Sequence, residues 1–153
     1  MKNVRHIVLV EDDARDAELT LEALKSFNLA NNLVHLKDGA EALDYVHRRG
    51  VFADRPPEPP GLLLLDLKMP KVGGVEVLRE MKGDPELKTI PIVVMTSSRE
   101  NHDLFECYRL GVNAYVVKPV KFVEFVDAVK QIGLFWAVVN EPCPPRANGG
   151  SAR

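Results

Sequence analysis

Four consecutive leucines, Leu62 to Leu65, end abruptly in a single carboxylate, Asp66. Turn-forming residues bound this run, with Pro59-Pro60-Gly61 before it and Pro70 after it. A short segment that is apolar at every position is typical of a strand buried on both faces, as in a parallel sheet. Ligands of open α/β sheets bind just outside the carboxyl ends of such strands, so Asp66 is a candidate functional residue. Taken alone, an Asp that caps a turn explains the pattern equally well.

Apolar segments alternate with helical patterns along the whole chain. The predicted strands span residues 6–10, 33–36, 62–65, 90–95 and 114–117. The predicted helices span about 13–27, a stretch that begins near Gly39, and about 75–82, 100–110 and 120–139. Strands that alternate with helices form βαβ units with right-handed crossovers. The sequence therefore predicts an α/β fold, with a parallel sheet covered by helices on both faces.

Length and composition are those of one ordinary globular domain. The 153 residues are 46% hydrophobic and 27% charged, with a net charge of −2, which gives no electrostatic reason to expect binding to nucleic acid or to a membrane. There is no signal-peptide pattern, and the two Cys residues form no C-x-x-C pair, so neither a zinc site nor a disulfide framework is indicated. We expect a cytoplasmic protein in which residues 1–140 form the domain and residues 141–153 a disordered tail.

Polar residues follow four of the predicted strands. Glu11-Asp12, Asp66, Thr96 and Lys118 stand at these strand ends. Because the carboxyl ends of parallel strands meet at one rim of a sheet, these side chains are expected to converge. Each has a structural explanation alone, as a helix cap, a turn or a solvated lysine. Three carboxylates and a lysine at the same rim are much harder to explain in that way.

The predicted cluster of carboxylates favours a bound cation. Clustered carboxylates repel one another, so either their pKa values rise or a cation binds. A set of oxygen ligands with an open side suits Mg²⁺, which keeps several waters and shares them with phosphate. The four His residues are scattered without ligand spacing, which argues against zinc. Asp13, next to the cluster, is assigned to the N-terminal cap of the following helix.

Short motifs at these strand ends resemble the response-regulator receiver domain of two-component signalling. They are Val10-Glu11-Asp12, Leu65-Asp66, Met69-Pro70 with Gly73-Gly74, Met95-Thr96-Ser97 and Tyr115-Val116-Val117-Lys118-Pro119. The resemblance covers about residues 4–139. It implies a flavodoxin-like (βα)5 fold with strand order 2-1-3-4-5. It also implies a phosphoacceptor signalling protein rather than an enzyme, one that assists its own phosphorylation and dephosphorylation, with a sensor histidine kinase as partner.

The same resemblance assigns roles to individual residues. Asp66 is the phosphoacceptor, and Lys118 pairs with the phosphoryl oxygens. Thr96 is the hydroxyl that senses the phosphoryl group, and Tyr115 is the aromatic switch that turns inward when Thr96 moves. The peptide bond between Lys118 and Pro119 is typically cis in this family, a state that only X–Pro bonds adopt readily.

Mg²⁺ is the cofactor that the resemblance implies. Its ligands would be Glu11, Asp12, Asp66 and the backbone carbonyl of Lys68. The side chain of Lys68 departs from the pattern of the family, because many members carry an uncharged polar residue two positions after the phosphoacceptor. Lys68 is expected either to pair with an acidic residue or to screen the phosphoryl group, and Ser98 is a second position that can tune its hydrolysis.

The predicted last helix carries apolar residues on two faces. At helical spacing, the stripe expected to pack on the sheet comprises Phe122, Phe125, Val126, Val129, Ile132 and Trp136. A second apolar face predicts a partner surface made by Leu134, Phe135 and Val138, with Phe105 and Tyr108 from the preceding helix. The alternative is that the tail folds back over this face. With the long Pro-containing loop before residue 62, this helix looks most like single-domain regulators paired with phytochrome-type histidine kinases (bacteriophytochromes), which commonly form homodimers.

Two other functions are compatible with the sequence. An aspartyl-phosphate hydrolase or phosphotransferase of the haloacid-dehalogenase kind also uses an Asp after a strand. That class carries a second Asp two residues on, where this chain has Lys68. The other alternative is an interaction module that works without phosphorylation, although such a module has no need of the charge cluster. Nothing after Val139 is long or apolar enough to fold as an output domain, so output is expected through the surface of this domain.

Overall fold

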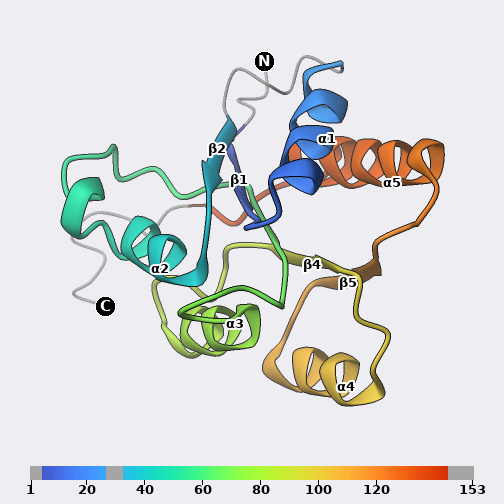
Figure 1. Ribbon diagram of the computed structural model, residues 1–153. Coiled ribbons are helices and arrows are strands. Elements are labelled where there is room, and N and C mark those ends of the chain that lie inside the picture. Colours follow the sequence, from blue (N-terminus) through green and yellow to red (C-terminus); the bar gives the residue numbers. More distant parts are fainter. Residues whose placement is uncertain (1–4, 27–32, 145–153) are drawn as a thin grey trace.

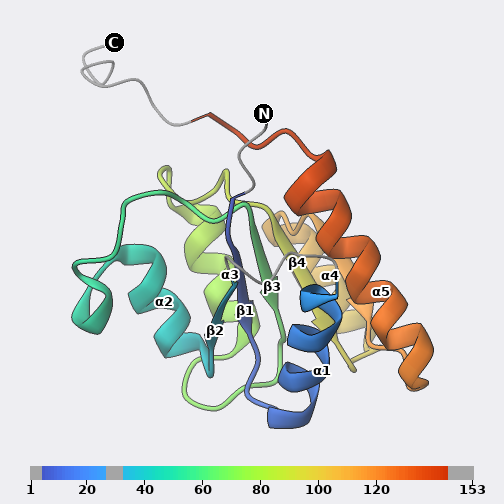
Figure 2. The same ribbon diagram turned by 90° about the horizontal axis from the view of Figure 1, so that it is seen from above.

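The computed structural model describes residues 5–26 and 33–144, and a central sheet lies between two layers of helices (Figure 1, Figure 2). The strands are β1 (Ile7–Val10), β2 (Leu33–Leu36), β3 (Leu62–Leu65), β4 (Ile92–Thr96) and β5 (Ala114–Val117). The helices are α1 (Ala14–Lys25), α2 (Gly39–His47), α3 (Gly74–Gly83), α4 (Asn101–Leu110) and α5 (Phe122–Leu134). A 3₁₀ helix, η2 (Gly50–Phe52), follows α2, and a π-helix, η3 (Phe135–Val139), continues α5.

The five strands are all parallel and lie in the order β2-β1-β3-β4-β5. This order confirms the predicted flavodoxin-like α/β fold. The register aligns the ends of the central strands, because Val10 is the partner of both Leu36 and Leu65, and Leu65 is the partner of Val94. The residues that follow β1 and β3 therefore emerge side by side at one rim of the sheet.

Alternate leucines of β3 belong to the two hydrophobic cores of the molecule. Leu62 and Leu64 pack in the core with α1 and α5, whereas Leu63 and Leu65 pack in the core with α2, α3 and α4. This division follows from the strand geometry, in which successive side chains point to opposite faces. Each of the four is at most 2% exposed, and burying a leucine stabilises the fold by roughly 1.5–3 kcal/mol. The strand that carries Asp66 is thus firmly anchored on both faces.

Two predicted helix ends are confirmed in detail. Asp13 caps α1, because its Oδ1 accepts a hydrogen bond from the backbone N–H of Asp16 at 2.9 Å. Gly111 ends α4 with a φ of 100°, a left-handed conformation that favours glycine. Its N–H bonds to the carbonyl of Tyr108 at 3.0 Å, which satisfies one of the free carbonyls of the last turn.

Other boundaries differ from the predictions by one or two residues. The first strand begins at Ile7, and β4 runs from Ile92 to Thr96, so Thr96 ends the strand and does not follow it. The helix predicted to end at Phe27 ends at Lys25, and Phe27 itself lies outside the described residues. Most of the tail predicted from residue 141, namely residues 145–153, also lies outside them. Among the residues that the structure describes, no helix is long and apolar enough to cross a membrane.

The expected cis peptide bond is not present. The described residues contain no cis peptide bond, so the Lys118–Pro119 bond is trans. The trans form of an X–Pro bond is the more stable by about 0.5–1 kcal/mol unless tertiary contacts select the other isomer. The resemblance was therefore wrong on this point.

The apolar stripe predicted for α5 is confirmed except at its first residue. Phe125 and Val129 are buried against α1 and the sheet, and Val126, Ile132 and Trp136 pack against the same core. Phe122, by contrast, is 60% exposed. It is the first residue of α5, and the first turn of this helix lies at the rim of the molecule, away from the strands (Figure 1, Figure 2). The sheet therefore does not cover the first residue of the stripe.

Candidate functional site

Three carboxylates converge at the carboxyl ends of β1 and β3. Glu11 and Asp12 follow β1, and Asp66 follows β3. One carboxylate oxygen of each lies within 4.8 Å of the others. Glu11 is 3% exposed and Asp66 8% exposed, whereas Asp12 faces solvent. The three carboxylates therefore converge as predicted, and the cluster opens to solvent on the side of Asp12.

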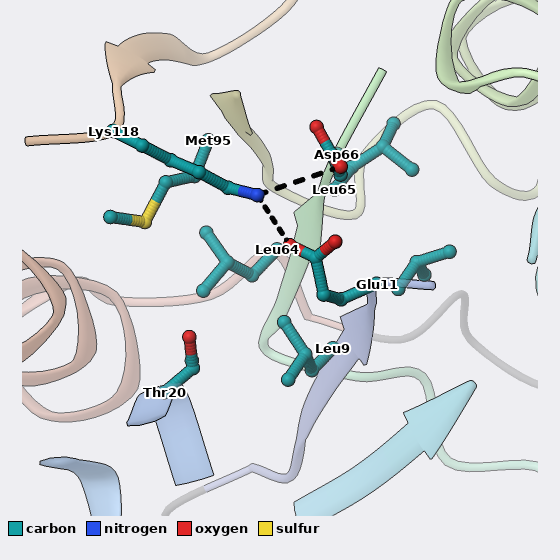
Figure 3. A pocket seen from close by; sticks show the side chains of 9 residues that line it. Leu9, Glu11, Thr20, Leu64, Leu65, Asp66, Met95 and Lys118 are labelled. Carbon is teal, nitrogen blue, oxygen red and sulfur yellow. Dashed lines mark hydrogen bonds and ion pairs between the residues drawn. The ribbon is translucent and has the colours of Figure 1, made fainter. Parts of the chain in front are cut away.

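Lys118, just after β5, reaches over the end of the sheet into this cluster (Figure 3). Its Nζ lies 2.7 Å from Oε1 of Glu11, 2.7 Å from Oδ2 of Asp16 and 3.5 Å from Oδ2 of Asp66. Burial lowers the pKa of Lys118, but the hydrogen bonds to Asp16 and Glu11 and the charge of Asp66 outweigh burial and hold the pKa well above its usual value. Lys118 is therefore a fixed positive charge beside the candidate phosphoacceptor.

The buried position of Glu11 shifts the pKa of its carboxyl group. Burial raises the pKa of Glu11 to about 7, the hydrogen bond from Lys118 opposes this rise, and the charge of Asp66 adds to it. Both of its oxygens are engaged, since Oε1 bonds to Lys118 and Oε2 accepts the N–H of Asp13 at 3.2 Å. The crowded negative charge makes this rim a favourable place for a cation.

Backbone contacts fix the orientation of Asp66. Its Oδ1 accepts the N–H of Leu67 at 2.8 Å, and its own N–H donates to the carbonyl of Val10 at 3.1 Å. The loop after it turns tightly back, because the N–H of Gly74 donates to the carbonyl of Leu67 at 2.9 Å. A Cβ at Gly74 would overlap the carbonyl oxygen of Asp66, so only glycine allows this close approach of α3 to the strand end.

Thr96 and Tyr115 both contact the loop that follows β4. Thr96 is fully buried, and its Oγ1 accepts the N–H of Ser98 at 3.4 Å. The half-buried Tyr115 donates its hydroxyl to the carbonyl of Ser98 at 3.1 Å, and burial raises the pKa of its phenol. Thr96 and Tyr115, the two residues that the resemblance couples in the switch, therefore both contact Ser98.

Lys68 pairs with an acidic residue, which is one of the two outcomes expected for it. Its Nζ lies 3.3 Å from Oδ2 of Asp103 in the first turn of α4. Ser98 donates its hydroxyl to the same oxygen at 2.5 Å. The hydrogen bond from Ser98 lowers the pKa of Asp103 most strongly and that from Lys68 lowers it further, while burial raises it. The carboxylate of Asp103 is thus held ionised although its side chain is only 9% exposed.

Sequence reasoning missed two of these acidic partners, Asp16 and Asp103. Asp16 lies in the first turn of α1, and that turn begins at the same rim as the strand ends, so an acidic residue there can also reach the cluster. Asp103 shares helical spacing with Cys107 and Leu110 on α4. An acid within such an apolar stripe indicates a buried, partnered carboxylate.

A small cavity lies beneath the charged groups (Figure 3). Its volume is about 10 Å³, roughly the space of one water molecule. Around the ion cluster its lining comprises Leu9, Val10, Thr20, Leu64, Leu65 and Met95. The cavity is therefore mostly apolar and too small to hold more than about one water molecule.

Comparison with known proteins identifies the family. The response regulator receiver domain matches residues 7–130 of this chain, which therefore belongs to that family. The chain is 39% identical over 130 residues to the response regulator Rcp1 of Synechocystis, a match that covers 85% of this chain and 87% of Rcp1. Neither the hydrolase nor the phosphorylation-independent module is favoured by these matches.

Solved structures of phytochrome response regulators share the fold. The phosphorylated cyanobacterial phytochrome response regulator RcpA superimposes with a TM-score of 0.87 at 38% identity, covering 93% of this chain and all of RcpA. The bacteriophytochrome response regulator AtBRR is 53% identical with a TM-score of 0.72, covering 92% of this chain and 100% of AtBRR. Rcp1 has also been solved in a Mn²⁺-bound form, at a TM-score of 0.85 and 36% identity over 92% of this chain and 99% of Rcp1. The chain is a response regulator similar to those associated with phytochromes.

Proposed function

We propose that Asp66 accepts a phosphoryl group from a sensor histidine kinase of the bacteriophytochrome type in the cytoplasm. The observation that carries this proposal is the position of Asp66, a buried and oriented carboxylate 3.5 Å from the Nζ of Lys118. The similarity to RcpA and AtBRR supports the kind of kinase. A buried carboxylate beside a fixed cation is the arrangement that phosphoryl transfer to Asp requires.

The transfer needs little chemistry beyond positioning. An oxygen of Asp66 attacks phosphorus, the P–N bond of the phosphohistidine breaks, and the imidazole nitrogen leaves with the electron pair. Lys118 neutralises negative charge on the phosphoryl oxygens as the bond forms. Because the product is a labile acyl phosphate, the same groups also assist its hydrolysis, and the signal decays unless it is renewed.

Mg²⁺ is the cofactor that the donor set fits best. The carboxylates of Glu11, Asp12 and Asp66 gather hard oxygen ligands within 4.8 Å of one another, and the backbone carbonyl of Lys68 would complete the protein ligands. The Mn²⁺-bound form of Rcp1 supports a divalent ion at such a site. When bound, the ion supplies positive charge that screens the carboxylates from the incoming phosphoryl group.

Phosphorylation is then read by the loop after β4. A phosphoryl group on Asp66 would offer the hydroxyl of Thr96 a charged acceptor, whereas its Oγ1 now accepts a long hydrogen bond of 3.4 Å from the N–H of Ser98. Movement of Thr96 shifts Ser98, whose carbonyl holds the hydroxyl of Tyr115. The charge added at Asp66 thus changes the conformation of the surface formed by α4, β5 and α5.

The phosphoacceptor is tested by incubating the protein with Mg²⁺ and a small phosphodonor or the purified kinase. Wild type is expected to give a retarded band on a phosphate-affinity gel, and Asp66→Asn is expected to give none. Asp13→Asn, which keeps the helix cap, is the matched control and is expected to behave as wild type. Retarded bands of equal intensity in wild type and Asp66→Asn would contradict the assignment.

We further propose that this surface binds a second copy of the chain. Large apolar side chains are exposed on both helices, with Phe105 71% and Tyr108 56% exposed on α4, and Phe135 48% and Val138 41% exposed on η3, which continues α5. Leu134 is only partly buried and lies beside them in sequence. Exposed apolar side chains of this size are typical of an interaction surface, and a homodimer would cover them.

Oligomeric mass tests the dimer, measured by light scattering with and without a phosphoryl mimic. Wild type is expected to dimerise, and Phe135→Glu to weaken the dimer at least tenfold because a charge replaces an apolar contact. Val51→Glu is the matched control, since Val51 is 91% exposed on η2, outside this surface. A wild-type protein that is monomeric in both states would refute the homodimer.

A further inference from the structure

Ser98 hydrogen-bonds to residues of β4, β5 and α4. Its N–H donates to Thr96, its carbonyl accepts the hydroxyl of Tyr115, and its own hydroxyl donates to Asp103. Asp103 in turn contacts Lys68 in the loop that follows the phosphoacceptor. A continuous chain of contacts therefore runs from the loop after β3, through α4, to the loop after β4 and the aromatic residue of β5.

The two charged members of this chain sit in different environments. The side chain of Asp103 is 9% exposed, whereas that of Lys68 is 62% exposed. Among the described residues, Lys68 is the only cation that lies within 4 Å of the carboxylate of Asp103. A flexible, solvated lysine can exchange partners at little cost, but a buried carboxylate that loses its cation is destabilised. Lys68 can thus leave the ion pair at little cost, whereas the buried carboxylate of Asp103 is destabilised when the pair breaks.

We propose that Asp103 is a positioning residue that holds the first turn of α4 and the loop after β4 in their unphosphorylated arrangement, and that Lys68 makes this hold depend on phosphorylation. The inference rests on the proposed function, because it requires a phosphoryl group on Asp66. Lys68 lies two residues from Asp66 on the same loop. A phosphoryl group with a charge near −2 competes with the single charge of Asp103 for the ammonium group.

Loss of Lys68 from Asp103 has a defined consequence. Among its side-chain partners in the described part of the chain, the carboxylate of Asp103 then keeps only the hydroxyl of Ser98, so the first turn of α4 and Ser98 become free to move together. The carbonyl of Ser98 carries the hydroxyl of Tyr115 with it. This route acts in parallel with the movement of Thr96 and reaches the same surface.

A double-mutant cycle with Lys68→Gln and Asp103→Asn tests the inference. The readout is hydrogen exchange of the α4 amides, in Mg²⁺ without and with beryllofluoride as the phosphoryl mimic. Without the mimic, each single variant is expected to exchange about fivefold faster than wild type, and the double variant no faster than either. With the mimic, wild type is expected to exchange as fast as the variants, and the coupling between the two positions is expected to vanish.

Glu106→Gln is the matched control, because it breaks the ion pair of Glu106 with Arg109 on the same helix. Its effect is expected to be equal in both states. Coupling between positions 68 and 103 that persists unchanged with the mimic bound would overturn the inference while leaving phosphorylation of Asp66 intact. The ¹⁹F signal of bound beryllofluoride separates the two: its absence from wild type would refute the proposed function itself, and this inference with it.

Discussion

Lys118→Gln is expected to lower the free energy of unfolding by about 3 kcal/mol when no divalent metal is present, near the low end of the cost of breaking a buried ion pair. The substitution leaves the carboxylates of Glu11 and Asp66 buried without their cation, and it removes the 2.7 Å contact to Asp16. The low end applies because the side chain of Asp16 is 29% exposed and so retains water. Urea unfolding in EDTA, followed by circular dichroism, measures the change.

Mg²⁺ is expected to restore part of the lost stability of Lys118→Gln, because the ion neutralises the same carboxylates. Lys121→Gln is the matched control: Lys121 is exposed three residues further along, and its substitution is expected to change stability by less than about 0.5 kcal/mol. If the unfolding curves of Lys118→Gln and wild type superimpose in EDTA, the lysine does not hold the carboxylates together.

The layout of the fold followed from patterns that are local in sequence. The unbroken run Leu62–Leu65 required a strand covered on both faces, and the structure packs its alternate residues in two separate cores. Strand order could not be obtained from such patterns alone, because every parallel order buries these strands equally well. It came from the resemblance to the receiver family.

The convergence of Glu11, Asp66 and Lys118 was predictable for a related reason. The carboxyl ends of parallel strands lie at one rim of the sheet, so a polar residue directly after a predicted strand is expected at that rim. The partners supplied by helices were not predictable in this way. Asp16 reaches Lys118, and Asp103 reaches Lys68, only because of how α1 and α4 rotate as they pack on the sheet. That rotation is set by tertiary packing.

The exposure of Phe122 shows the same limit at the end of a helix. Helical spacing places Phe122 on the stripe of Phe125 and Val129, and both of these are buried. Periodicity describes which face a residue shares, but not how far along the helix the neighbouring sheet extends. The apolar first turn of α5 is therefore exposed, with Val123 75% exposed beside Phe122.

Asp12→Asn is expected to lower the affinity for Mg²⁺ about 100-fold and to leave the stability of the metal-free protein within about 0.5 kcal/mol of wild type. Two unit charges 4 Å apart interact by about 4 kcal/mol at an effective dielectric constant of about 20, so the loss of one carboxylate ligand from a divalent ion readily accounts for about 2.7 kcal/mol. Stability is spared because Asp12 is exposed. Isothermal titration calorimetry measures the affinity.

Asp13→Asn separates the specific role of Asp12 from a general loss of negative charge. It makes the same chemical change one residue along, at a carboxylate that caps α1 and stands outside the cluster of Glu11, Asp12 and Asp66. Asn caps helices as well as Asp does, so this variant is expected to bind Mg²⁺ within about threefold of wild type. Equal losses of affinity in Asp12→Asn and Asp13→Asn would mean that Mg²⁺ responds only to the overall negative charge of the rim. A loss confined to Asp12→Asn, with unfolding in EDTA unchanged, identifies Asp12 as a ligand that contributes to metal binding and not to folding, the converse of Lys118.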